Sequence, residues 1–115
     1  MTVNDIIKIL NANIITASNL NTEVKTACGS DMMSDVLAYV KDQSVLITGL
    51  VNPQVVRTAD MMDIKCIVFV RGKEPDETVI KIAQEKAITL ISTKLRMFTT
   101  CGLLYTNGLR GGCEV

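Results

Sequence analysis

Hydrophobic and polar positions follow one repeated pattern through the second half of the chain. An uninterrupted apolar run ends in a short polar turn, and an amphipathic helical pattern follows. The runs begin at Val45, Ile67 and Leu90, which lie 22 and 23 residues apart. This spacing is too short for separate domains and is typical of successive strand-helix units in one parallel sheet. The runs lack polar alternation, which favours strands covered by helices on both faces.

The first half predicts further elements of the same sheet. Thr2 and Asp5 form a capping-box pattern that opens a short helix. Ile14–Thr16 reads as one strand and Val24–Cys28 as another, but the pattern leaves their directions open. The sequence therefore predicts an α/β fold: a three-layer α/β/α sandwich with a mostly parallel sheet of four to five strands.

Helix start signals follow each of the three repeated runs. Asn52 is placed to cap a helix with Pro53 in its first position, and Pro75-Asp76-Glu77 opens the next helix. Thr93 is expected to cap the last helix, which Asn107-Gly108 ends. Residues 1–109 are predicted to form a single domain, and the polar, Gly-rich residues 110–115 a flexible tail.

The predicted topology brings the carboxyl ends of the three strands, and the amino ends of the helices after them, to one edge. Helix amino ends and free cations there suit an anionic small molecule such as a phosphate-bearing ligand. Each candidate also has a plain structural reading as a turn glycine, a helix cap or a solvated charge. The candidate ligand-binding residues are Thr48, Gly49, Asn52, Arg57, Arg71, Gly72, Lys73, Ser92 and Thr93.

Charge and composition narrow the classes of partner. Twelve Lys and Arg balance twelve Asp and Glu, so no overall field draws the chain to nucleic acid or to an anionic membrane. Of the four aromatic residues, Phe69 and Phe98 fall in apolar patterns that predict core positions rather than base stacking. No apolar run approaches the length of a membrane span, and the first ten residues resemble neither a signal nor a transit peptide. We expect a cytoplasmic protein.

The chain has four cysteines in no metal-binding spacing and no histidine. We therefore expect no metal site and no cofactor, and Ser-His and Cys-His mechanisms are excluded. The favoured interpretation is a non-catalytic domain. An alternative is a small enzyme acting on a phosphorylated metabolite, with Arg71 and Lys73 holding the anion and Asp31 acting as base.

Four segments together resemble the DRTGG-domain family: Asp31–Leu37, Leu46–Leu50, Ile67–Lys73 and Leu90–Phe98. The resemblance covers nearly the whole chain and implies an α/β domain similar to the amino-terminal domain of HPr kinase/phosphorylase. It also implies a regulatory, dimer-forming or ligand-sensing role. The chain departs from the family's namesake residues: Leu50-Val51 replaces Asp-Arg, and Val70-Arg71-Gly72 replaces Thr-Gly-Gly, so that only Gly72 is retained.

The resemblance, together with a mean hydropathy of +0.30, favours a homodimer that acts on a protein partner. The alternative to ligand sensing, besides the small enzyme, is an assembly adaptor whose strand-end edge binds no small molecule.

Overall fold

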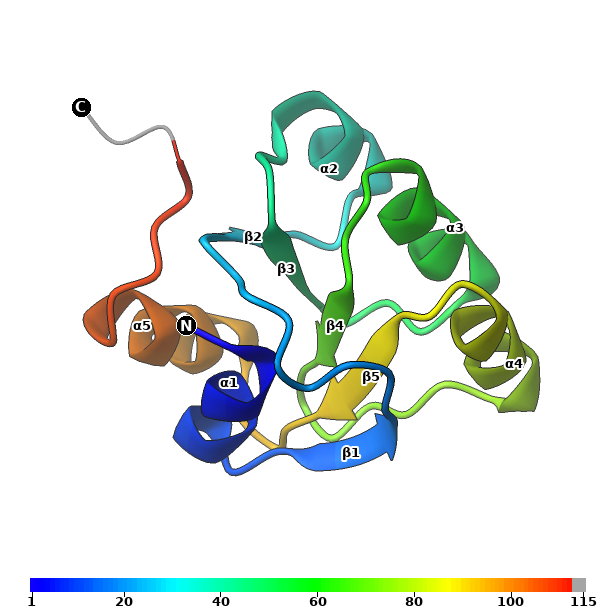
Figure 1. Ribbon diagram of the computed structural model, residues 1–115, viewed down its shortest axis with the longest axis horizontal. Helices are drawn as coiled ribbons and strands as arrows, with labels where there is room; N and C mark the ends of the chain where they lie inside the picture. Colours follow the sequence, from blue (N-terminus) through cyan, green and yellow to red (C-terminus); the bar gives the residue numbers. More distant parts are fainter. Residues whose placement is uncertain (113–115) are drawn as a thin grey trace.

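A computed structural model describes residues 1–112 and shows one five-stranded sheet flanked by five helices (Figure 1). The strand order is β1-β5-β4-β3-β2; the four strands from β2 to β5 run parallel, and β1 pairs antiparallel with β5. In chain order the elements are α1 (Val3–Leu10), β1 (Asn13–Thr16), β2 (Thr26–Gly29), α2 (Met33–Tyr39), β3 (Ser44–Thr48), α3 (Pro53–Met61), β4 (Cys66–Phe69), α4 (Glu77–Glu85), β5 (Thr89–Ser92) and α5 (Met97–Thr106).

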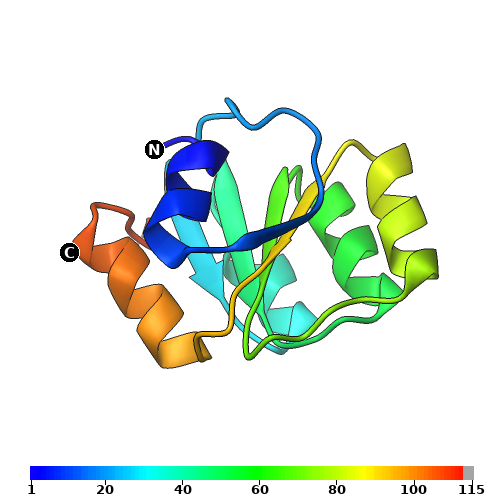
Figure 2. The same cartoon turned by 90° about the horizontal axis from the view of Figure 1, so that it is seen from below.

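The helices form two layers with the sheet between them (Figure 2). Helices α2, α3 and α4 cover one face, where Leu46, Ile67 and Leu90 join their apolar residues in one core cluster. Helices α1 and α5 cover the other face, where Val45 and Val68 belong to a second cluster. The predicted α/β fold with a mostly parallel sheet is confirmed, and its cause is the burial of both faces of the central strands.

Local signals open most of the helices as predicted. The Thr2 hydroxyl accepts from the Asp5 amide and the Asp5 carboxylate from the Thr2 amide, which is a complete capping box. Asn52 accepts from the Val55 amide at 3.3 Å, and Asp76 caps α4 in the same way. Each side-chain acceptor satisfies a backbone N–H that has no partner within the helix.

Two predictions about the last helix were wrong. Helix α5 begins at Met97 with Arg96 as its N-cap residue, and no side chain caps it, so Thr93 is not its cap. Phe98, predicted to lie in the core, is 88% exposed. Helix α5 packs Met97, Cys101 and Leu104 against the second core cluster, and Phe98 lies off this stripe, on the solvent side of the helix.

The carboxyl-terminal residues that are described lie against β2. Arg110 forms a β-bridge with Thr26, and its carbonyl accepts from the Ala27 amide at 3.0 Å. Its guanidinium lies 3.9 Å from the centre of the Tyr105 ring. The domain boundary at residue 109 and the tail stay predictions, and positions 113–115 of that tail lie outside the described residues.

Ala87 offers a stability test of the backbone after α4. It follows the C-cap residue Lys86 with a φ of 56°, in the left-handed region that glycine adopts without a steric penalty. Ala87→Gly is expected to raise the free energy of unfolding by about 0.5–1 kcal/mol, measured by urea denaturation.

Ala38 is the matched control for Ala87, since it is an exposed alanine within α2. Ala38→Gly is expected to lower stability by about 1 kcal/mol, because glycine is a poor helix former. Equal losses in both variants would contradict the conformational argument.

Candidate functional site

The candidate site is the sheet edge where β2, β3, β4 and β5 end side by side. Backbone hydrogen bonds tie the loops beyond these ends together: Ser30 N–H donates to Ile47 O at 3.0 Å, and Val70 N–H to Thr48 O at 3.0 Å. Gly72 N–H donates to Thr93 O at 2.8 Å. Hydrogen bonds between backbone groups therefore hold the loops at this edge together as one surface.

Arg71 and Gly49 meet at the centre of this edge. Arg71 has a φ of 62° and donates its amide to Leu95 O at 2.8 Å, which fixes the start of its side chain. Its guanidinium packs over Gly49, where an added Cβ would overlap the terminal nitrogen and lie 3.2 Å from Cζ. The absence of a side chain at Gly49 thus makes the room that Arg71 occupies.

The Arg71 guanidinium has no carboxylate partner within residues 1–112. The ion pairs found there join the amino terminus to Glu23, Lys65 to Asp63 and Lys86 to Asp60. A guanidinium presents five N–H donors in a planar fork that matches carboxylate and phosphate oxygens. As far as residues 1–112 show, the Arg71 guanidinium is available to bind an anion.

Asp31 belongs to this edge; the sequence named it only as the base of the alternative enzyme and not among the ligand-binding candidates. Its Oδ1 accepts from the Gly49 amide at 2.7 Å and from the Thr48 hydroxyl at 3.1 Å, while Thr48 Oγ1 accepts from the Leu50 amide at 3.1 Å. Asp31 follows the end of β2 as Gly49 follows the end of β3, and the two strands are parallel neighbours. The sequence does show an aspartate shortly after the second predicted strand, but placing it beside Gly49 required knowing that β2 runs parallel to β3.

The remaining candidate residues lie in three different settings. Gly72 adjoins Arg71, and Ser92 is buried opposite Phe69 in the ladder. Lys73 is exposed in the loop after β4, and Arg57 is exposed on α3. Asn52 lies at the start of α3, where its side-chain oxygen is used as a cap.

Thr93 is directed away from the group formed by Thr48, Gly49 and Arg71. Its hydroxyl donates to Leu10 O at 3.2 Å and accepts from the Leu95 amide at 3.3 Å. The bond to Leu95 lies within the loop after β5, and the bond to Leu10 joins this loop to the end of α1. Thr93 thus connects the edge to the α1 side of the sheet.

The groups at the edge supply positive charge, a carboxylate and hydrogen-bonding atoms. Within the described residues no three His, Cys, Asp or Glu side chains gather where they would hold a metal ion. Burial raises the pKa of the Cys66 thiol to about 12, and it also raises the pKa of the half-buried Cys28 and Cys101 thiols. These thiols are therefore protonated and poorly nucleophilic at neutral pH.

No helix in residues 1–112 has the length and apolarity needed to span a bilayer.

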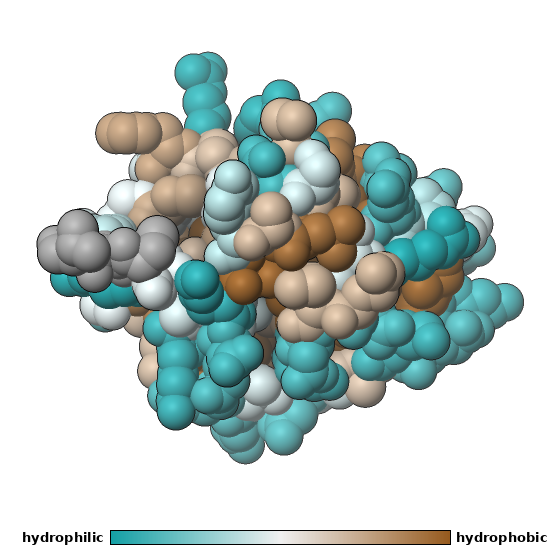
Figure 3. Space-filling model, turned by 90° about the horizontal axis from the view of Figure 1, so that it is seen from above, coloured by the Kyte–Doolittle hydropathy of each residue, from teal (hydrophilic) through white to brown (hydrophobic). Residues whose placement is uncertain are grey.

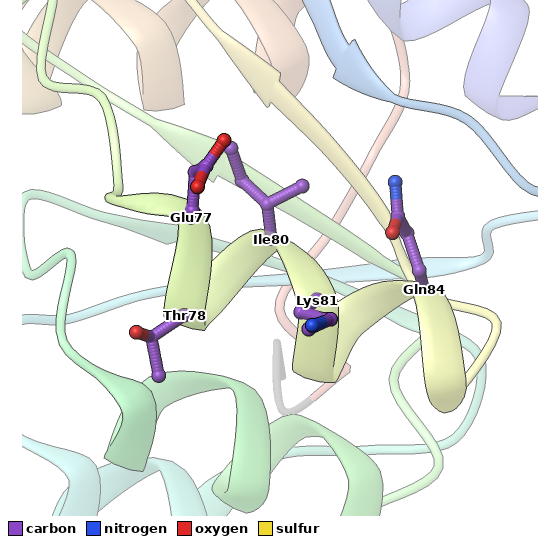
Figure 4. A pocket seen from close by; sticks show the side chains of 5 residues that line it. All are labelled: Glu77, Thr78, Ile80, Lys81 and Gln84. Carbon is purple, nitrogen blue, oxygen red and sulfur yellow. The ribbon is translucent and has the colours of Figure 1, made fainter.

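A separate cavity of about 460 Å³ lies on the outer surface of α4 (Figure 4). Glu77, Thr78, Ile80, Lys81 and Gln84 line it, and no candidate ligand-binding residue is among them. A surface formed by one helix lacks the converging polar groups from several elements that a ligand pocket usually has. The strand-end edge, with groups from three loops, remains the better candidate site.

Comparison with protein families matches residues 5–106 to the DRTGG domain. No curated protein matches the chain. Among solved structures, the CBS and DRTGG domains of the regulatory region of Clostridium perfringens pyrophosphatase, complexed with the activator diadenosine tetraphosphate, superpose with a TM-score of 0.75. The sequence identity is 17%, and the match covers 90% of this chain and 45% of that one. At this identity the likeness shows a common fold.

Proposed function

Because the chain belongs to the DRTGG-domain family, we propose that it is a regulatory domain that senses a phosphate-bearing metabolite or nucleotide at the carboxyl edge of its sheet. The observation that carries the proposal is Arg71, a guanidinium without a carboxylate partner in residues 1–112 that packs over Gly49 beside the start of α3. The Thr48 hydroxyl and the exposed Lys73 add a hydrogen-bonding group and a second cation.

Asp31 supplies a means by which binding would be transmitted. Its carboxylate accepts hydrogen bonds from the Gly49 amide and the Thr48 hydroxyl, which are donors that a phosphate oxygen would also use. A ligand that accepts from these donors replaces Asp31 and releases the loop between β2 and α2. Met32 just before α2, and Leu37 and Tyr39 within it, are exposed, so this movement would reach an apolar surface that a protein partner recognises.

Two observations support a phosphate-bearing ligand: the cations at the strand-end edge and the ligand of one structurally similar protein. The clostridial regulatory region is complexed with a dinucleotide that has four phosphates. We propose a phosphate-bearing ligand for this chain as well, in a domain that works without catalysis and as a homodimer. The exposed apolar residues at the start of α2 and along it support a protein partner.

A thermal-shift screen of nucleotides, dinucleoside polyphosphates and phosphorylated metabolites tests the ligand site on wild type and Arg71→Gly. At 100 times its Kd a ligand stabilises wild type by about 2.7 kcal/mol, and this gain should vanish in the variant. Glycine suits the φ of 62° at this position, so the ligand-free variant should be as stable as wild type or up to about 1 kcal/mol more stable.

Lys25→Ala is the matched control. It removes one exposed cation just before β2, at the amino ends of the parallel strands and away from the candidate site. It should keep the full ligand shift. A shift retained in Arg71→Gly would place binding elsewhere, and no shift with any phosphate compound would favour the assembly adaptor. Turnover that Asp31→Asn abolishes while binding persists would identify the small enzyme instead.

A further inference from the structure

The two outer edges of the sheet differ in their hydrogen bonding. On the β2 edge, Arg110 forms a bridge with Thr26 and accepts from the Ala27 amide. On the other edge, the backbone of Asn13–Thr16 bonds to β5 and to no other backbone group in residues 1–112. Figure 2 shows β1 crossing the front of the molecule on this open side. Among the described residues, the chain itself pairs with the β2 edge, whereas the β1 edge has N–H and C=O groups without a backbone partner.

The β1 edge lacks the residues that usually keep an exposed strand from pairing. From Asn11 to Thr22 the sequence has no charged residue, no proline and no glycine. The side chain of Ile14 is 49% exposed beside this edge. The four-residue length of β1 and its register shift between Ile14 and Thr16 limit how far another strand can pair, but the outer backbone groups have no backbone partner in residues 1–112.

We propose that β1 is the interface of the homodimer and that it pairs antiparallel with β1 of a second copy. The proposal rests on the homodimer included in the proposed function and assigns its surface. Antiparallel pairing of a strand with its own copy obeys a two-fold axis, so the same residues serve both partners. The pairing joins the two five-stranded sheets into one.

Charge and geometry favour a second copy over a different partner. The edge has no charged residue with which to select a partner of opposite charge, and a net charge of zero causes no repulsion between copies. Association also stops at two chains, because Arg110 covers the β2 edge of each copy.

A rival surface lies on α2 and α3. The face that carries these helices has a central apolar area (Figure 3), and its exposed large apolar residues are Met32, Leu37, Tyr39 and Met61. Unlike β1, this surface has no row of backbone groups that a second strand would satisfy. It is the natural comparison in a test.

Matched lysine substitutions distinguish the two surfaces. Ile14 is 49% exposed and Leu37 42% exposed, so neither Ile14→Lys nor Leu37→Lys removes a core side chain. Light scattering after size-exclusion chromatography, over a range of concentrations, gives the dimer dissociation constant. Ile14→Lys should raise it about two- to fivefold, since pairing brings the lysines of the two copies near each other. Leu37→Lys should leave it unchanged.

Hydrogen exchange gives an independent readout at the backbone. Amides of Asn13–Thr16 should become more protected as the concentration rises, and they should lose this concentration dependence in Ile14→Lys. A dimer weakened by Leu37→Lys and not by Ile14→Lys would overturn the β1 interface while leaving the homodimer intact. A wild-type chain that is monomeric at all concentrations would overturn both the β1 interface and the homodimer. The thermal-shift screen would still test the ligand site separately.

Discussion

Replacing Phe69 by alanine is expected to lower the free energy of unfolding by about 3–5 kcal/mol. Phe69 is the largest fully buried side chain and belongs to the core cluster beneath α2, α3 and α4. Truncation removes its apolar contacts and leaves a cavity that the sheet and helices fill only in part. Because a domain is usually stable by about 5–15 kcal/mol in total, the loss should be large in urea denaturation.

Phe98→Ala is the control for this result, since Phe98 is the same residue type and 88% exposed. It should change stability by no more than about 0.5 kcal/mol. Similar losses in both variants would mean that Phe98 is buried in solution by another molecule or by a different packing of α5. The effect of Phe69→Ala also bears on the site, because Phe69 lies between Thr48 and Ser92 in the ladder.

Alkaline pH should destabilise the fold through Cys66. Burial raises the pKa of this thiol from 9.0 to about 12. In the unfolded chain the thiol ionises near pH 9, whereas in the folded chain it keeps its proton, so stability is lost as the pH rises from 9 to 12. At about 1.4 kcal/mol for each unit of pKa difference, the full loss is about 4 kcal/mol, and below pH 9 this contribution is intact.

Urea denaturation of wild type and Cys66→Ala between pH 7 and 11 measures this effect, because subtraction removes the titration of lysines and tyrosines common to both. At pH 7 wild type should be the more stable, since the variant has a small cavity. By pH 11 the difference should shrink by about 2–3 kcal/mol and favour the variant. A constant difference across this range would show that Cys66 is reached by solvent.

The pattern of the chain predicted the sheet well because the central strands are buried on both faces. Val45, Ile67 and Leu90 begin runs that read as strands without alternation, and the structure places all three at no measurable exposure. Capping residues were equally informative, since Asn52 makes its predicted bond within three residues of itself. Such signals are local, and local sequence is enough to specify them.

Phe98 and Thr93 show where local reasoning failed. An apolar residue in a helix is in the core only if it lies on the stripe that faces the sheet, and on α5 that stripe is formed by Met97, Cys101 and Leu104. Thr93 has the composition of a cap, but its hydroxyl bonds to Leu10, 83 residues away in sequence. No pattern near position 93 identifies that partner.

The sequence by itself determined the fold class, the parallel strand-helix units and the edge at which Thr48, Gly49 and Arg71 gather. It did so because burial and capping leave periodic, short-range signs in the chain. Only the tertiary structure decided that β2 runs parallel beside β3, which brings Asp31 onto the Gly49 amide. It alone decided that Arg71 lies over Gly49 without a carboxylate partner in residues 1–112, and that β1 leaves its outer edge open where β2 does not. These features depend on strand order and on contacts between distant residues, which hydrophobic periodicity does not encode.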